Sequence, residues 1–469
     1  MQPKSSRLIE TTWPDIRPLP EPPAPLDTAT YTARLDQLRA MMAPTGYTHL
    51  VIYGDREHFA NLTYLTGFDP RFEEALLVLS GNDKPLIIAG NESLGYLPIS
   101  PLYREGLLRS ERYATFSLLD QPRLGCRQLA EILADERIGA TSQVGCVGWK
   151  YLTSREHPNA RHALELPSYI VDILRSLCPT EQVFNANDLL MHPAYGMRAT
   201  VSSDEAAYFE YTNVLASEGM RRMLLGLEPD MPDYAVAELA RLNGMPLGCH
   251  MTVVTGDTRD CGMNSPLGAP VRLGEPFAAN VSYWGSNCCR AGWVAESSSD
   301  LPLGCEDYVS TFAGPYMAAM GEWFRALKIG ATGGAVQQVI DALLPDDIFH
   351  IELNAGHLIH YDEWLSSPIK PGSEIPLRSG MVIQSDVIPS SSDYFSTRME
   401  DGYLLADNAL QSELSSRYPE CYARCLERRS FMRNVLGLPV GDDLLPLSNL
   451  AGIVPPYLLD PTTLLALEA

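Results

Sequence analysis

The sequence predicts an α/β protein of two domains, and three observations carry this prediction. The chain has 469 residues, 45% of them hydrophobic, so it is too long for one ordinary core and apolar enough to build two. Its first half alternates helix-like with strand-like segments. Its second half opens with two helices and continues as short strands. We therefore expect a proline-rich tail over residues 1–25, an α/β domain over 26–195, and an α+β domain over 196–469 that ends in a helical extension.

The elements of the first domain follow from hydrophobic periodicity. Residues 31–54 show helical spacing followed by an apolar strand, and residues 73–90 read as two strands around a Ser-Gly-Asn-Asp turn. The same rhythm continues through residues 126–149 and 169–190, then fades at a His-Pro-Ala-Tyr-Gly stretch. A domain boundary near residue 195 is the consequence.

The second domain begins with a capped helix. Residues 201–227 carry a Ser/Asp start signal and about six turns of helical spacing, and residues 229–245 form a second helix opened by proline and aspartate. Five segments with β-forming residues and Gly, Pro or Asn at their ends are predicted strands: 250–256, 276–285, 291–297, 381–389 and 399–407. The chain after residue 410 reads as helical and is then interrupted by prolines.

Composition excludes several classes of protein. Acids outnumber bases by 58 to 35, a net charge of −23, which would repel nucleic acid and anionic membranes. No run of about 18 apolar residues is present, and the first thirty residues lack the apolar core of a signal peptide, so we expect a cytoplasmic protein. The ten cysteines are scattered without a CxxC pair, which indicates neither a zinc knuckle nor a disulfide framework.

The stretch "NAGHLIHYDEW", residues 354–364, concentrates histidine and acid in a chain with only nine histidines. A histidine titrates near neutral pH, so beside a carboxylate it can transfer protons. His357 with Asp386 or Glu400 is predicted to be such a pair, and these three residues are the candidate catalytic groups.

The order of five motifs resembles that of the creatinase, prolidase and aminopeptidase P superfamily. These motifs are "NLTYLTGFDPRFEEALLVL" at 61–79, "VTGDTRDCGMNSPLGAPVRLGEPFAANVSYWG" at 254–285, the stretch at 354–364, "SGMVIQSDVIP" at 379–389 and "STRMEDGYLLAD" at 396–407. The resemblance implies a creatinase-like N-terminal domain followed by a catalytic domain with the pita-bread fold. It also implies a homodimer, because a partner's N-terminal domain typically closes the site in this superfamily.

Metallopeptidases of the superfamily bind two divalent ions through two aspartates, one histidine and two glutamates. The resemblance places His357 in the histidine position and Asp386 and Glu400 in the glutamate positions. The aspartate positions fall on Asn280 and at or beside Arg290. An amide is a poor ligand and a guanidinium repels a metal ion, so we expect no two-metal site and no cofactor. A single divalent ion on His357, Asp386 and Glu400 stays open.

Creatinase itself lacks metals and also has asparagine in the first aspartate position. The resemblance therefore implies a metal-independent hydrolase that cleaves a carbon–nitrogen bond in a small amino-acid-like or guanidino substrate. Only His357, Arg398 and Glu400 match functional residues of creatinase, whereas Met263 stands where its principal catalytic histidine would be, so creatine is not the expected substrate. An Xaa-Pro aminopeptidase-like metallopeptidase and a non-catalytic binding protein of the same fold remain alternatives. No long charged tail of the kind that binds partners is present, which favours an enzyme.

The residues predicted to contact a small-molecule substrate are Arg290, Arg398, Asn280, His360, His250, Arg71 and Trp364. Arg290 and Arg398 would hold an anionic group, and Arg71 would reach a partner's site. His360 lies three residues after His357 in a strand-like segment, so a structural role on the opposite face competes with a role in the pocket. Arg290, Asp386 and Glu400 also fit a purely structural ion network. Cys289, beside Arg290, is open between a reactive and a packed thiol.

Overall fold

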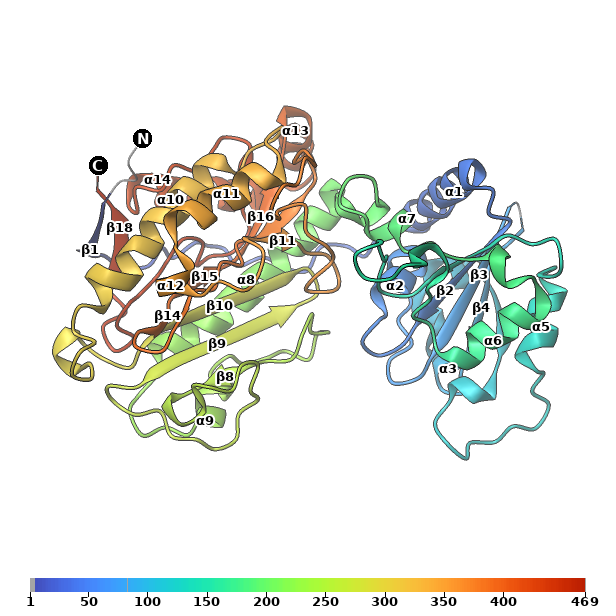
Figure 1. Ribbon diagram of the computed structural model, residues 1–469, viewed down its shortest axis with the longest axis horizontal. Coiled ribbons are helices and arrows are strands. Elements are labelled where there is room, and N and C mark those ends of the chain that lie inside the picture. Colours follow the sequence, from blue (N-terminus) through green and yellow to red (C-terminus); the bar gives the residue numbers. More distant parts are fainter. Residues whose placement is uncertain (1–4, 82, 469) are drawn as a thin grey trace. The chain divides into compact units, whose positions relative to one another are not determined.

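The computed structural model describes residues 5–81 and 83–468 (Figure 1). The chain divides into two compact units, a smaller one over residues 24–199 and a larger one over residues 1–23 and 200–469. The segment expected to be a tail thus packs with the larger unit, and the division falls after Ala199 where the sequence suggested residue 195.

The smaller unit is built on a six-stranded mixed sheet in the order β5-β4-β3-β2-β6-β7. Its strands are β2 (His49–Gly54), β3 (Ala75–Ser80), β4 (Leu86–Ala89), β5 (Arg109–Arg112), β6 (Val144–Val147) and β7 (Val183–Asn185). Its α-helices are α1 (Thr28–Thr45), α2 (Ala60–Thr66), α3 (Ser93–Tyr96), α4 (Pro101–Arg104), α5 (Leu129–Asp135), α6 (Ser168–Leu177) and α7 (Asp188–Met191). The turn expected between β3 and β4 includes residue 82, which lies outside the described residues.

Alternate side chains along the strands form the hydrophobic core of this unit. Val51 and Tyr53 of β2 point to one face, where they join the apolar side chains of α5 and α6. Strands β2 and β3 are buried along their whole length, so the sheet has covered faces on both sides. Helix–strand alternation in the sequence therefore corresponds to a sheet covered by helices.

The larger unit contains two four-stranded sheets, β15-β10-β9-β8 and β11-β12-β16-β17, and two short two-stranded sheets, β1-β18 and β13-β14. Its strands are β1 (Ser6–Glu10), β8 (Val253–Val254), β9 (Pro276–Tyr283), β10 (Ser286–Trp293), β11 (His357–Leu358), β12 (Val382–Gln384), β13 (Ser390–Ser391), β14 (Phe395–Ser396), β15 (Arg398–Glu400), β16 (Gly402–Leu405), β17 (Leu444–Pro446) and β18 (Thr463–Leu467). Its α-helices are α8 (Ser203–Leu225), α9 (Asp233–Glu238), α10 (Gly314–Ala326), α11 (Gly333–Leu343), α12 (Asp346–Phe349), α13 (Asn408–Arg417) and α14 (Pro419–Asn434).

Helix α8 is the long element that supports the sheets. Ser202 and Glu205 close its N-terminus with a reciprocal capping box. The helix packs along β9 and β10 (Figure 1). Its Glu210 accepts hydrogen bonds from Arg424 at 2.7 Å and from Arg428 at 2.6 Å, both on α14, and all three side chains are buried. The C-terminal helical extension is therefore fastened to the central helix by a buried ionic network.

The central hairpin differs from the sequence prediction. A tight turn at Gly285, whose φ of +78° suits glycine, joins β9 directly to β10, so the second strand begins at Ser286. The predicted strand at 291–297 thus begins five residues too late, because the β-forming residues start beyond the polar first half of β10. The helix expected at 229–245 is limited to α9.

No described helix is long and apolar enough to cross a membrane.

Candidate active site

A cavity of about 840 Å³ opens in the larger unit over one face of the β15-β10-β9-β8 sheet. Strand register brings Asn280 on β9, Cys289 on β10 and Glu400 on β15 side by side, because directly paired residues of antiparallel strands share a face. Six predicted site residues line this cavity: His250, Asn280, Trp364, Asp386, Arg398 and Glu400. Six of the predicted site residues thus lie around one cavity.

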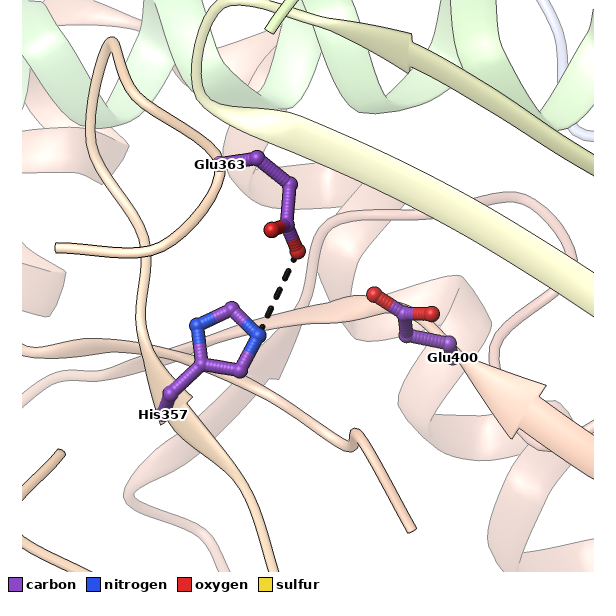
Figure 2. Close-up of side chains that lie close together, drawn as sticks. All are labelled: His357, Glu363 and Glu400. Atoms are coloured by element: carbon purple, nitrogen blue, oxygen red, sulfur yellow. Dashed lines mark ion pairs between the residues drawn. The ribbon is translucent and has the colours of Figure 1, made fainter. Parts of the chain in front are cut away.

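Four ionisable side chains meet at one wall of the cavity. Nε2 of His357, the first residue of β11, lies 3.3 Å from a carboxylate oxygen of Glu363 and 3.7 Å from one of Asp386. Figure 2 shows the carboxylates of Glu363 and Glu400 turned toward the imidazole. His357 is fully buried and reaches the cavity through Glu363 and Asp386, which line it.

His357 is held in its charged form. Burial lowers the pKa of this imidazole, but neighbouring carboxylates, Glu363 first, outweigh burial and raise the pKa to about 9. Nδ1 donates to the backbone carbonyl of Leu358 at 3.1 Å, so both ring nitrogens face acceptors. Trp364 lies flat on the ring, with centroids 4.0 Å apart and an interplanar angle of 18°. An indole face stabilises a cation, so this stacking also favours the imidazolium.

Burial raises the pKa of both remaining carboxyl groups, but the value for Asp386 is about 6, so Asp386 still loses its proton at neutral pH. Burial raises the pKa of Asp386, and the charge of His357 only partly offsets that effect. Burial, followed by the nearby charges of Asp386 and Glu363, raises the pKa of Glu400 well above its ordinary value. Because several carboxyl groups lie close together beside one imidazolium, Glu400 keeps its proton near the cavity at neutral pH.

Two amide hydrogen bonds in series connect Glu400 to Asn280. Asn287 Nδ2 donates to Glu400 Oε1 at 2.7 Å, and Asn280 Nδ2 donates to Asn287 Oδ1 at 3.2 Å. Asn280 Oδ1 accepts from the backbone and the hydroxyl of Thr252 at 2.5 and 2.6 Å. The side-chain oxygen of Asn280 is therefore already occupied by protein donors.

Arg398 contributes a cation to the cavity wall. Its guanidinium lies 3.9 Å from Cys289 Sγ, and its Nε is buried without a hydrogen-bond partner. Burial raises the pKa of Cys289 to about 12, with the charge of Arg398 acting in the opposite direction. The thiol therefore stays protonated at neutral pH, which supports the packed rather than the reactive alternative.

The prediction that Arg290 contacts the substrate is wrong. Arg290 points to the face of β10 opposite Cys289, where it donates to Asp401 at 2.7 Å and to the carbonyls of Ile453 and Leu450. Strand alternation explains the error, because the position beside Arg290 that faces the cavity is Cys289. Arg290 thus follows the structural alternative, with Asp401 rather than the catalytic acids as its partner.

His360 is likewise not part of the cavity wall. It is fully buried, with Nε2 3.3 Å from a carboxylate oxygen of Glu205 on α8 and its ring edge-on to Phe209. The odd spacing from His357 sends its side chain to the other side of the segment. Its role is to pack the segment against α8.

The last two candidates lie in very different places. His250 is exposed on the cavity rim, where Nε2 lies 3.3 Å from the carbonyl oxygen of Met263. Arg71 belongs to the smaller unit, where it pairs with Asp69 and stacks over Tyr96. Its contribution to a partner's site stays a prediction, as does the homodimer.

Glu363 and Asn287 are the site residues that the sequence analysis missed. Glu363 stands six residues after His357 inside the motif quoted for its histidines and acids. The acids in that motif were a sufficient signal for Glu363. Asn287 carried no signal, because its position depends on the tight β9–β10 turn.

The side chains do not fit the two-metal site of the superfamily's metallopeptidases. Asn280 and Cys289 offer an amide and a protonated thiol where the resemblance calls for aspartates, and Asp386 is one methylene shorter than glutamate. His357, Glu363 and Glu400 do offer three ligand atoms within 4.8 Å of one another, a set that suits one divalent ion.

Comparisons with known proteins agree with this architecture. No family model matches the sequence, and a search of curated proteins finds no significant relative. Among solved structures, the dipeptidase PepE from Mycobacterium ulcerans superimposes with a TM-score of 0.61 and 17% identity over 82% of this chain and 95% of that one. The prolidase from Pyrococcus horikoshii OT3 gives 0.61 and 12% over 80% and 95%. The N-terminal domain of the FACT complex subunit SPT16 from Cicer arietinum gives 0.58 and 14% over 81% and 95%. The chain therefore shares the fold of these structures, which is the pita-bread fold that the sequence predicted.

Proposed function

We propose that the larger unit is a metal-independent hydrolase that cleaves a carbon–nitrogen bond in a small amino-acid-like or guanidino substrate. The observation that carries the proposal is the buried cluster of His357, Glu363, Asp386 and Glu400 beside a cavity that also contains Arg398. Two cations, His357 and Arg398, oppose the ionised acids, so the cluster is charge-balanced by protein groups.

Each group has a role in this reaction. Asp386 takes a proton from water as the water oxygen bonds to carbon, and Glu400 gives its proton to the nitrogen as the carbon–nitrogen bond breaks. His357 stays charged and stabilises the carboxylates around it. Arg398 holds an anionic group of the substrate. The raised pKa of Glu400 suits an acid that must carry a proton at neutral pH.

The names of the structural neighbours support hydrolysis of this bond type. Two of these neighbours are a dipeptidase and a prolidase, and both names denote cleavage of a peptide carbon–nitrogen bond. At 17% and 12% identity the likeness extends to the fold, and the chemistry is inferred from the side chains of this chain.

Two other functions have an observation in their favour. An Xaa-Pro aminopeptidase-like metallopeptidase would hold one ion on His357, Glu363 and Glu400, and the ion would polarise a carbonyl oxygen. A non-catalytic binding protein has a precedent in the neighbour that is a domain of a FACT complex subunit.

The test is turnover by protein dialysed against EDTA. Xaa-Pro dipeptides, N-acyl amino acids, creatine and guanidino acids are incubated with and without Mn²⁺ or Zn²⁺, and released amine is measured. We expect turnover of at least one class without added metal, and its loss in Glu400→Gln and Asp386→Asn but not in Glu322→Gln, a half-buried acid on α10. Activity that appears only with metal supports the metallopeptidase. No turnover of any class supports the binding protein.

A further inference from the structure

A second cavity of about 420 Å³ lies in the larger unit between the end of α8, the segment after α9 and the N-terminal segment. Its volume falls within the range of roughly 300–1,000 Å³ that is typical of small-molecule sites. It shares no lining residue with the candidate active site.

The wall of this cavity is positively charged in a chain of net charge −23. Four arginines line it against the single acid Glu218. Arg17 is paired with Asp15 at 2.7 Å, outside the cavity wall. Glu218 lies 3.7 Å from Arg221 and also accepts a hydrogen bond from Asn449 at 2.9 Å. The only carboxylate of the wall is therefore already engaged.

Arg17 and Arg221 each have a carboxylate neighbour, so Arg222 and Arg241 provide the remaining positive charge of the cavity wall. Arg222 donates only to the neutral carbonyls of Leu239 at 3.3 Å and Ala240 at 2.6 Å. Neither arginine forms an ion pair in the part of the chain that the structure describes. Burial lowers the pKa of Arg222, the charge of Glu218 acts in the opposite direction, and the like charge of Arg241 lowers the pKa again. A bound anion would stabilise both guanidinium groups.

The rest of the wall is apolar and accessible. Leu225 is 56% exposed and Leu19 is 40% exposed, and both line the cavity beside the arginines. A ligand complementary to both the arginines and the leucines would have an anionic group at one end and an apolar or aromatic group at the other.

We propose that this cavity binds a small phosphate monoester that carries an aromatic or apolar group. Arg222 and Arg241, which form no ion pair among the described residues, offer two positive charges to the two negative charges of such an ester, and the planar fork of arginine matches the geometry of phosphate oxygens. The leucines contact the organic part, so the ester is preferred over the free anion.

The test is calorimetric titration of the full chain with phenyl phosphate, compared with inorganic phosphate and benzoate at equal ionic strength. We expect saturable binding of phenyl phosphate, with weaker binding of both controls. Arg241→Gln and Arg222→Gln should each weaken it by at least about tenfold, the effect of losing one charge-assisted hydrogen bond. Arg241 is exposed, so its substitution leaves the core intact and keeps the test valid if the Arg222 variant fails to fold.

Arg325→Gln is the matched control, because Arg325 is an exposed arginine of the same unit that pairs only with Glu322 on the surface. It should bind phenyl phosphate as the unaltered protein does. Absence of binding at 10 mM, on the order of the weakest specific affinities, would overturn the proposal. Equal binding by Arg241→Gln, or inorganic phosphate binding as tightly as the ester, would overturn it too.

Discussion

Arg290 and Asp401 form an ion pair of 2.7 Å in which both side chains are shielded from solvent. Arg290 also donates to backbone carbonyls of the segment that follows β17, so its charge is fully engaged by the core. The pair lies on the face of β10 that is turned away from the cavity, and its importance is for folding.

Arg290→Ala should therefore lower stability. Removing one partner leaves Asp401 as an uncompensated buried charge, which costs roughly 3–5 kcal/mol of unfolding free energy. Urea denaturation of the variant measures the loss. Arg325→Ala, which breaks an exposed pair, should cost less than about 1 kcal/mol. A stable Arg290→Ala protein that has lost only ligand binding would return Arg290 to the site.

Stability should fall as pH rises from about 6.5 to about 9. The folded chain keeps the proton of His357 up to a pKa of about 9, whereas an unfolded histidine releases it near 6.5. The native state thus binds more protons in this window, and the contribution, on the order of 3 kcal/mol, is present below the window and lost above it. Urea denaturation across this range measures the slope, and His357→Gln should flatten it. An equal slope in both proteins would contradict a charged His357.

Glu400→Gln should leave stability at pH 8 unchanged or slightly increased. Glutamine has the shape of the protonated acid and can still accept the hydrogen bond from Asn287. Glu210→Gln provides the contrast, because Glu210 is buried between Arg424 and Arg428 and its loss should cost roughly 3–5 kcal/mol. Thermal denaturation of both variants makes the comparison. Equal destabilisation by the two changes would show that Glu400 is ionised.

Cys289 should resist alkylation. Its pKa of about 12 leaves almost no thiolate at pH 8, and the side chain is buried on β10. Iodoacetamide treatment of the native protein followed by peptide mass spectrometry should label exposed Cys261 and spare Cys289. Rapid modification of Cys289 would support the nucleophilic alternative.

Much of the fold could be predicted from the sequence, because hydrophobic periodicity reports which segments alternate and the order of motifs resembles a known superfamily. Helix α8 and strand β9 were predicted from a capped periodic run and an apolar segment. Helices α10 and α11 were missed, since no motif drew attention to the region between β10 and β11.

The sequence indicated which residues form the site, but not which face of the sheet each side chain lies on. Asp386 and Glu400, which the motif positions indicated as catalytic groups, line the cavity. The second aspartate position was uncertain by one residue, so Arg290 was named instead of its neighbour Cys289. Adjacent residues of a strand point to opposite faces of the sheet, so this shift changes the face. Glu363 was overlooked for a different reason, because attention within its motif fell on the two histidines.

The pairing of β1 with β18 has a consequence for the order in which the chain is made. Five residue pairs join Ser6–Glu10 to Thr463–Leu467, and the smaller unit lies between them in the sequence. On the ribosome, the smaller unit can fold as soon as its 176 residues emerge, since none of its strands waits for a later partner. Strand β1 must remain unpaired throughout that time, until β18 is synthesised. A fusion at the N-terminus that delays or blocks this last pairing should therefore impair the larger unit while the smaller one folds normally.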